Sequence, residues 1–199
     1  MHKRSIAIRE VELYKLGDAA RMRGEALLEK LTLDNPWKHI GVMLIVSPMA
    51  QPRPRFRVIR QGAFHRVHAY DPPESDSWKE EFGIKVGALL PEGFPKKGTV
   101  EIRAKVFKKI PKSYSSGLRW LCEAGEVRPE KKPDADNYVK AIKDALTGWV
   151  WEDDSQAVLV ECEKFYSAVP RVEFVVRYRD RPLDRIAKKK RERESDGNG

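Results

Sequence analysis

The sequence reads QAVLVECEKFYSAVPRVEFVVRY over residues 156–178, and it predicts two β-strands. Apolar residues alternate with polar ones in each half, as in Val160-Glu-Cys162 and Val172-Glu-Phe174. This alternation is typical of half-buried strands, which we place at about 156–166 and 171–178. The four residues between them are a hairpin-length turn. We therefore expect the two strands to pair with each other.

The sequence outside this stretch predicts two more strands and several helices. We expect strands at 39–46 (HIGVMLIV) and 99–107 (TVEIRAKVF). We expect helices within 8–33, from Ser75 or Ser77 until Pro91, and over 137–147 with Gly148 as its stop. Residues 51–70 indicate an irregular loop or a loose hairpin, and 110–131 a long loop. This order favours an α/β fold, with helices packed on a mixed sheet of about four strands.

A chain of 199 residues is long enough for one domain with arms. We assign residues 1–36 to an N-terminal helical extension and 37–180 to the folded domain. The segment 181–199 is a basic tail that we expect to be flexible. Hydrophobic residues make up 41% of the chain, which excludes disorder throughout its length.

Positive charge exceeds negative charge and lies in three blocks. The chain has 39 Lys and Arg against 30 Asp and Glu, a net charge of +9. Five arginines and no acid fall within 51–70, six bases and no acid within 103–121, and six bases within 185–193. Such an excess favours a polyanionic partner, either nucleic acid or an acidic membrane surface.

The sequence also excludes several classes of protein. It has no apolar run near the ~20 residues that span a bilayer, and no signal-peptide core, so we expect no membrane partner. Its two cysteines, Cys122 and Cys162, make neither a disulfide framework nor a zinc signature. A reducing, cytoplasmic setting fits best.

The acids gather in two pairs that flank the helix expected at 137–147. Asp134 and Asp136 precede it, with Asp136 as the expected N-cap, and Asp153-Asp154 follow it. That helix rises about 16 Å, and residues 148–152, if extended, span about 17 Å. The return segment is just long enough to bring the second pair back beside the first. On the helix, Lys140 falls on the same face as Asp136.

Converging carboxylates repel each other unless a cation lies between them. Hard oxygen ligands without nearby histidine or cysteine select Mg²⁺, or Mn²⁺ as its substitute. In a basic protein this pattern indicates phosphodiester hydrolysis, with Lys140 offsetting developing charge. The alternative is purely structural: Asp136 as a helix cap, Lys140 with Asp144 as an exposed pair, and Asp153-Asp154 as a turn.

The segment from Lys132 to Val158 resembles the RusA family of Holliday-junction resolvases. It contains Asp134-Ala-Asp136-Asn137, a lysine four residues after the second Asp, and the later Trp-x-Asp-Asp. The Pro- and Arg-rich stretch from Pro48 to Arg57 is similar to a loop of that family. The resemblance implies a bacterial or phage homodimer that cuts four-way DNA junctions by paired, symmetric nicks with Mg²⁺, in DNA recombination and repair.

The resemblance also implies roles for single residues. Catalytic residues by position are Asp134, Asp136, Asp154 and Lys140. Metal ligands by position are Asp134, Asp136, Asp153 and Asp154. Candidate DNA-binding residues are Arg53, Arg55, Arg57, Lys108, Lys109 and Asn137. We expect Phe56 to anchor its loop to the core, the alternative being stacking at a junction centre. Two other functions stay open: a non-catalytic branched-DNA-binding protein, and a metal nuclease acting on other DNA structures.

Overall fold

The computed structural model describes residues 18–61 and 64–182, which form parts of two compact units. One unit contains helix α1 (Asp18–Asp34), and the other runs from Trp37 to Pro182. We describe each unit by itself. The predicted helical region 8–33 is confirmed where α1 covers it, while residues 8–17 and nearly all of the basic tail lie outside the described residues.

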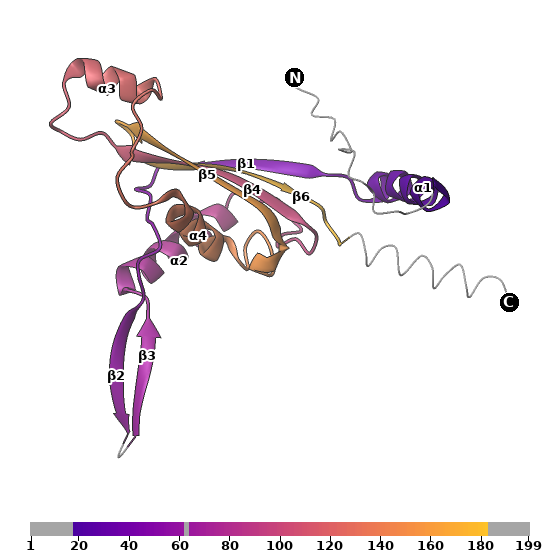
Figure 1. Cartoon of the computed structure of the whole chain (residues 1–199), viewed down its shortest axis with the longest axis horizontal. Coiled ribbons are helices and arrows are strands. Elements are labelled where there is room, and N and C mark those ends of the chain that lie inside the picture. The colour runs from indigo at the N-terminus through magenta and orange to yellow at the C-terminus, as the bar shows by residue number, and fades with distance from the viewer. Residues whose placement is uncertain (1–17, 62–63, 183–199) are drawn as a thin grey trace. The chain divides into compact units, whose positions relative to one another are not determined.

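A four-stranded mixed sheet organises the second unit, as the sequence predicted (Figure 1). Its strands are β1 (Lys38–Leu44), β4 (Val100–Lys109), β5 (Ala157–Ser167) and β6 (Arg171–Tyr178). Their spatial order is β1-β6-β4-β5. β4 and β5 are parallel, and β6 is antiparallel to both β1 and β4.

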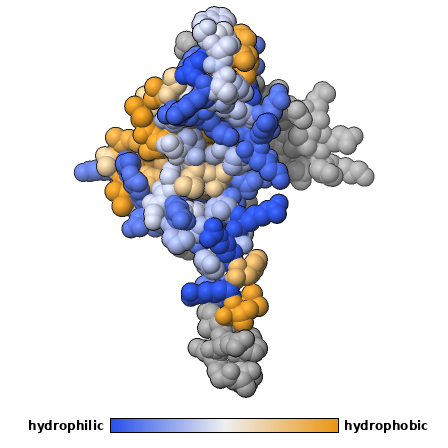
Figure 2. Space-filling view, turned by 90° about the vertical axis from the view of Figure 1, so that its left-hand side faces the viewer, coloured by the Kyte–Doolittle hydropathy of each residue, from blue (hydrophilic) through white to orange (hydrophobic). Residues whose placement is uncertain are grey.

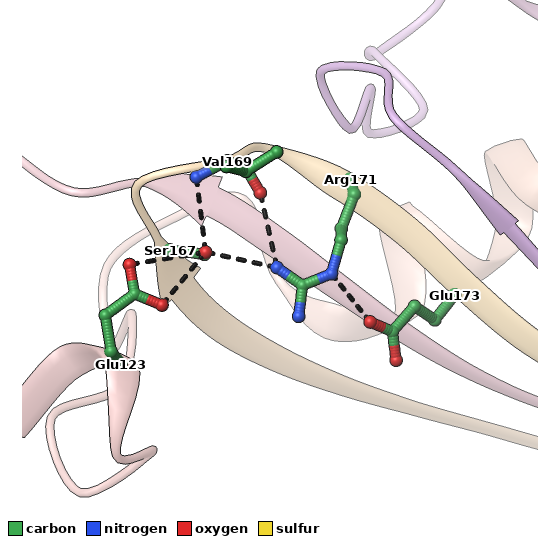
Figure 3. Close-up of polar contacts among 5 residues, drawn as sticks. All are labelled: Glu123, Ser167, Val169, Arg171 and Glu173. Carbon is green, nitrogen blue, oxygen red and sulfur yellow. Dashed lines mark hydrogen bonds and ion pairs between the residues drawn. The ribbon is translucent and has the colours of Figure 1, made fainter.

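The predicted pairing of the last two strands is wrong. β6 lies between β1 and β4, so the chain passes from β5 across β4 before it enters the sheet again. Side chains hold this short connection (Figure 3). Glu123 accepts hydrogen bonds from the Ser167 hydroxyl at 3.0 Å and from the Ala168 amide, while Arg171 donates to the Ser167 hydroxyl at 3.1 Å. Alternation determines which face of a strand is buried, but it does not determine the neighbouring strand.

Helices α2 (Pro73–Gly87) and α4 (Ala135–Leu146) cover one face of the sheet (Figure 1). The inward residues of β4 and β6 are buried beneath them, as their alternation predicted. The core members with the least exposure are Val86, Val100, Ile102, Val106, Ala141, Leu146, Val150, Trp151, Val172 and Val176. Burial of this apolar surface is the main force that seats α4 on the sheet.

The contact between α2 and α4 requires a glycine at position 83. A Cβ atom on Gly83 would lie 2.7 Å from the Ala145 carbonyl oxygen, which is backbone and can move only with its helix. We expect Gly83→Ala to cost about 1–3 kcal/mol of unfolding free energy, because the helices must separate. Gly117→Ala, where a Cβ meets nothing within 4 Å, should be neutral or slightly stabilising. Urea unfolding of both variants tests this, and equal midpoints would refute it.

The stretch 110–131 is not simply a loop, because it contains the helix α3 (Ser116–Glu123). Ser115 caps it, since its hydroxyl oxygen accepts a hydrogen bond from the Leu118 amide at 3.4 Å. Eight residues that include Gly117 are too short to give a clear helical period in sequence. α3 nevertheless has a structural role, because it supplies Glu123 to the β5–β6 connection.

Residues 51–70 form a hairpin, one of the two forms expected for them. β2 (Arg55–Gln61) and β3 (Phe64–Tyr70) pair with each other in a separate two-stranded sheet. Figure 1 shows this hairpin extending away from the four-stranded sheet, and Figure 2 shows apolar and hydrophilic residues side by side on it. Phe56 is 70% exposed, so the expectation that it anchors the loop to the core is wrong.

Candidate functional site

The first acidic pair lies at the start of α4. Asp134 is the N-cap, in an extended conformation, and its side chain makes no capping hydrogen bond. The helix therefore begins two residues earlier than expected, and Asp136 lies in its first turn instead of capping it. Both carboxylates are exposed, and neither forms an ion pair or hydrogen bond with another described residue. Their oxygens remain accessible to a ligand.

The amphipathic pattern predicted for α4 is confirmed. Its buried residues are Tyr138, Val139, Ala141, Ile142, Ala145 and Leu146. Asp136, Lys140 and Asp144 are exposed and spaced four residues apart, so they follow one another along the opposite face. This charged face faces away from the sheet and is available for chemistry.

The second acidic pair does not return to the first. Asp154 lies beside the far end of α4, with its Oδ2 3.7 Å from Lys143 Nζ. Lys143 follows Asp134 by nine residues, about 13 Å along the helix axis. The Asp153 carboxylate accepts a hydrogen bond from the Ser155 amide at 2.9 Å, and its bonding to Ser155 lowers the pKa of Asp153. Asp153 acts as the cap of a short 3-10 helix, Asp154–Gln156.

Burial of two residues explains why the pairs stay apart. Residues 148–152 do not form the extended return segment expected from the sequence, because Gly148 turns the chain with a φ of +84°. Val150 and Trp151 are fully buried, and the Trp151 indole donates to the Thr147 hydroxyl at 3.1 Å. The chain therefore folds back on the end of α4 and does not run along its length.

The described residues of one chain do not complete a metal site. Within residues 18–61 and 64–182, no three His, Cys, Asp or Glu side chains group closely enough to hold an ion. The predicted convergence of three or four carboxylates is therefore not observed. Asp134 and Asp136 have the donor chemistry that suits Mg²⁺, which proteins often hold through one or two carboxylates together with substrate phosphates. The chain offers part of a ligand set, not a closed cage.

Two lysines of the sheet lie behind the start of α4. Lys164 of β5 donates to the Pro133 carbonyl oxygen at 3.1 Å, and so supports the segment that enters the helix. Lys108 of β4 is half-buried, and burial followed by the charge of Lys164 lowers the pKa of Lys108. Lys109 points to the opposite face of the sheet and is exposed. The two candidates Lys108 and Lys109 therefore do not share a surface.

Lys164 is a site residue that sequence patterns did not predict, although a signal for it exists. It occupies the inward register of β5, in line with Val160 and Cys162, where a lysine is unexpected. Burial is the main cause that raises the pKa of Cys162 to about 11, and the negative charge of Asp136 contributes in the same direction. The inner face of β5 thus approaches the acidic start of α4. Asp71 and Lys79, which pair with each other beside α4, were also not predicted from the sequence.

The arginine candidates lie on and before the hairpin. Arg53, Arg55 and Arg57 are all exposed, and the Arg57 guanidinium lies 5.8 Å from the centre of the Tyr70 ring. Strand alternation places Arg55 and Arg57 on one face and Phe56 on the other. The segment that leads into the hairpin contacts α4, because the Gln51 backbone amide donates to the Asn137 carbonyl oxygen at 2.8 Å. The hairpin and the acidic helix are therefore connected.

Comparison with known proteins adds two findings. The family model described as endodeoxyribonuclease RusA matches residues 46–177, which include the hairpin and both acidic pairs. The uncharacterized protein YqaN of Bacillus subtilis (strain 168) is 42% identical over 133 residues, covering 66% of this chain and 90% of that protein. In the described parts of the chain, no helix is long and apolar enough to cross a membrane.

Proposed function

Because this chain belongs to the RusA family of endodeoxyribonucleases, we propose that it is a Mg²⁺-dependent resolvase that cuts four-way DNA junctions by paired, symmetric nicks. The observation that carries this proposal is the start of α4, where two exposed carboxylates precede Lys140 and one of them, Asp136, shares a helix face with it. The hairpin arginines give the same unit a surface for DNA phosphates. We place the activity in DNA recombination and repair.

Each group at α4 has a role in phosphodiester hydrolysis. Asp134 and Asp136 would hold Mg²⁺, or Mn²⁺ as its substitute, and Asp153 and Asp154 stand farther along the chain as additional candidates. The metal, when bound, polarises the phosphoryl oxygen and acidifies a bound water. The positive end of the α4 dipole attracts the scissile phosphate, and Lys140 offsets the charge that develops on it.

The remaining candidates would hold the DNA. Arg53, Arg55 and Arg57 would bind phosphates along one arm of the junction, with Lys108 near the helix start and Asn137 in its first turn. Lys109, on the opposite face, would contact a different part of the substrate. Contacts of this kind position the duplex and do not read its sequence. A homodimer would present two equivalent sites to a junction that itself has two-fold symmetry.

A strand-resolved cleavage assay tests the proposed function. We expect the purified protein to nick two opposite strands of a synthetic four-way junction with Mg²⁺ or Mn²⁺, and to give no product with chelator. Junction binding without product under any divalent ion would instead identify a non-catalytic branched-DNA-binding protein. Equal cutting of forks, single strands or duplex would identify a metal nuclease that acts on other DNA structures.

The hairpin arginines can be tested by binding alone. We expect replacement of both Arg55 and Arg57 by Gln to weaken junction binding about 10- to 100-fold at moderate salt. The slope of log affinity against log salt should become shallower by about two. Arg103 and Arg128, which pair with Glu161 and Glu163, form the matched control, because their replacement by Gln removes the same charge elsewhere. An equal loss of affinity in both double variants would contradict a specific role for the hairpin.

A further inference from the structure

Both ends of the β2–β3 hairpin meet at one carboxylate beside α4. Asp71 directly follows β3, and Gln51 lies in the segment that leads into β2. The Gln51 side-chain amide donates to Asp71 Oδ2 at 2.7 Å, so the two ends of the hairpin are tied to each other. This hydrogen bond closes the base of the hairpin beyond the last paired residues, Arg55 and Tyr70.

The same carboxylate is linked to both helices that cover the sheet. Lys79 of α2 donates to Asp71 Oδ2 at 3.0 Å, and its Nζ also lies 3.5 Å from Asp144 Oδ2 of α4. The side chains of Lys79 and Asp71 are 15% and 23% exposed, so solvent screens this pair less than a surface ion pair. In addition, the Gln51 backbone amide donates to the Asn137 carbonyl oxygen of α4. The base of the hairpin is therefore linked to α4 at two positions along the helix, at Asn137 and, through Lys79, at Asp144.

Electrostatics extend this link to Lys140. Hydrogen bonds from Lys79 and then Gln51, together with the charges of Lys79 and Lys140, lower the pKa of Asp71 against the opposing effect of burial. The carboxylate is therefore ionised at neutral pH. Its negative charge acts on the ammonium group of Lys140, which lies one turn before Asp144 on α4.

We propose that Asp71 is a positioning residue that couples the DNA-binding hairpin to the catalytic helix α4. It ties the two ends of the hairpin to each other and, through Lys79, to α4, whose first turn carries Asp136. This inference rests on the proposed function. DNA that is bound by the hairpin arginines then lies in one fixed position relative to α4. Without Asp71 the arginines still bind the backbone, but the scissile phosphate is no longer held at one place.

Separate measurements of binding and cutting test the proposal. In Asp71→Asn, we expect the dissociation constant for a four-way junction, measured without divalent ion, to stay within about threefold. The single-turnover cleavage rate of the bound junction should fall about 10- to 100-fold, since a misplacement of about 1 Å is costly in catalysis. Asp71→Glu keeps the charge and should recover part of the rate. Asp76→Asn, an equal charge change in the first turn of α2, should alter neither quantity.

Amide hydrogen exchange of the full chain provides a readout that needs no nuclease activity. We expect the segment that contains Gln51 to exchange faster in Asp71→Asn than in the wild type or in Asp76→Asn. If the wild type cuts junctions and Asp71→Asn cuts them equally fast, or loses affinity and rate in equal measure, the coupling role is overturned and the proposed function stands. If the wild type cuts no DNA, the proposed function fails, and unchanged exchange at Gln51 would overturn the coupling as well.

Discussion

Asp136→Asn is expected to bind four-way junctions as well as the wild type does and to cut them at least about 10³-fold more slowly. Asp136 is exposed in the first turn of α4 and forms no ion pair or hydrogen bond with another described residue, so its loss removes no contact that holds the fold. The cost of removing an acid from a helix N-terminus is about 0.3–1 kcal/mol. Asn has the same shape but lacks the charge that a divalent cation requires.

The binding half of this prediction has its own reason. Removal of a negative charge beside the DNA backbone lowers repulsion of phosphates, so affinity should stay constant or rise slightly. Nicked strands on a denaturing gel measure cutting, and a mobility shift without metal measures binding. Glu80→Gln, an exposed acid on α2, is the matched control and should behave like the wild type. A variant at Asp136 that cuts at the normal rate would remove Asp136 from the catalytic machinery.

The elements of the fold follow from the sequence better than their arrangement does. Alternation in 99–107 and 171–178 predicts both the strands and their buried faces, and Val100, Val106, Val172 and Val176 are indeed fully buried. The alternation does not predict that β6 lies between β1 and β4. It specifies which face of a strand is buried, but not which strand lies beside it. The β5–β6 connection is held by the nearby Arg171 of β6 and by Glu123 of α3, and Glu123 comes from a segment 44 residues away in sequence.

Part of the candidate site could likewise be predicted from the sequence, and part could not. The charged face of α4 follows from helical spacing, and the structure places Asp136, Lys140 and Asp144 along it. The placement of Asp153 and Asp154 does not follow, because it depends on the burial of Val150 and Trp151, which competes with an extended path. Lys79 and Asp71 were missed since each looks like an ordinary surface charge until α2 packs against α4.

Lys140→Met is expected to lower the single-turnover rate of junction cutting about 100-fold, while its effect on the dissociation constant stays small. The ammonium group lies on the exposed face of α4, between Asp136 and Asp144 in sequence and within the influence of Asp71. In the proposed role, a cation placed there would stabilise the charge that develops on the phosphoryl oxygens more strongly than it would stabilise the ground state. Methionine keeps the unbranched stem and the helix propensity of lysine, so α4 should remain intact.

A second variant separates this catalytic role from a general loss of positive charge. Lys85→Met removes the same charge from α2, where Lys85 pairs with Glu81 at 2.6 Å, and should leave the rate unchanged. Lys140→Arg keeps the charge but alters its geometry, and an intermediate rate is expected. If Lys140→Met weakened binding and left the rate of the bound complex unchanged, Lys140 would belong to the DNA-holding surface with the hairpin arginines. The acidic pair would then act without Lys140 as its cationic partner.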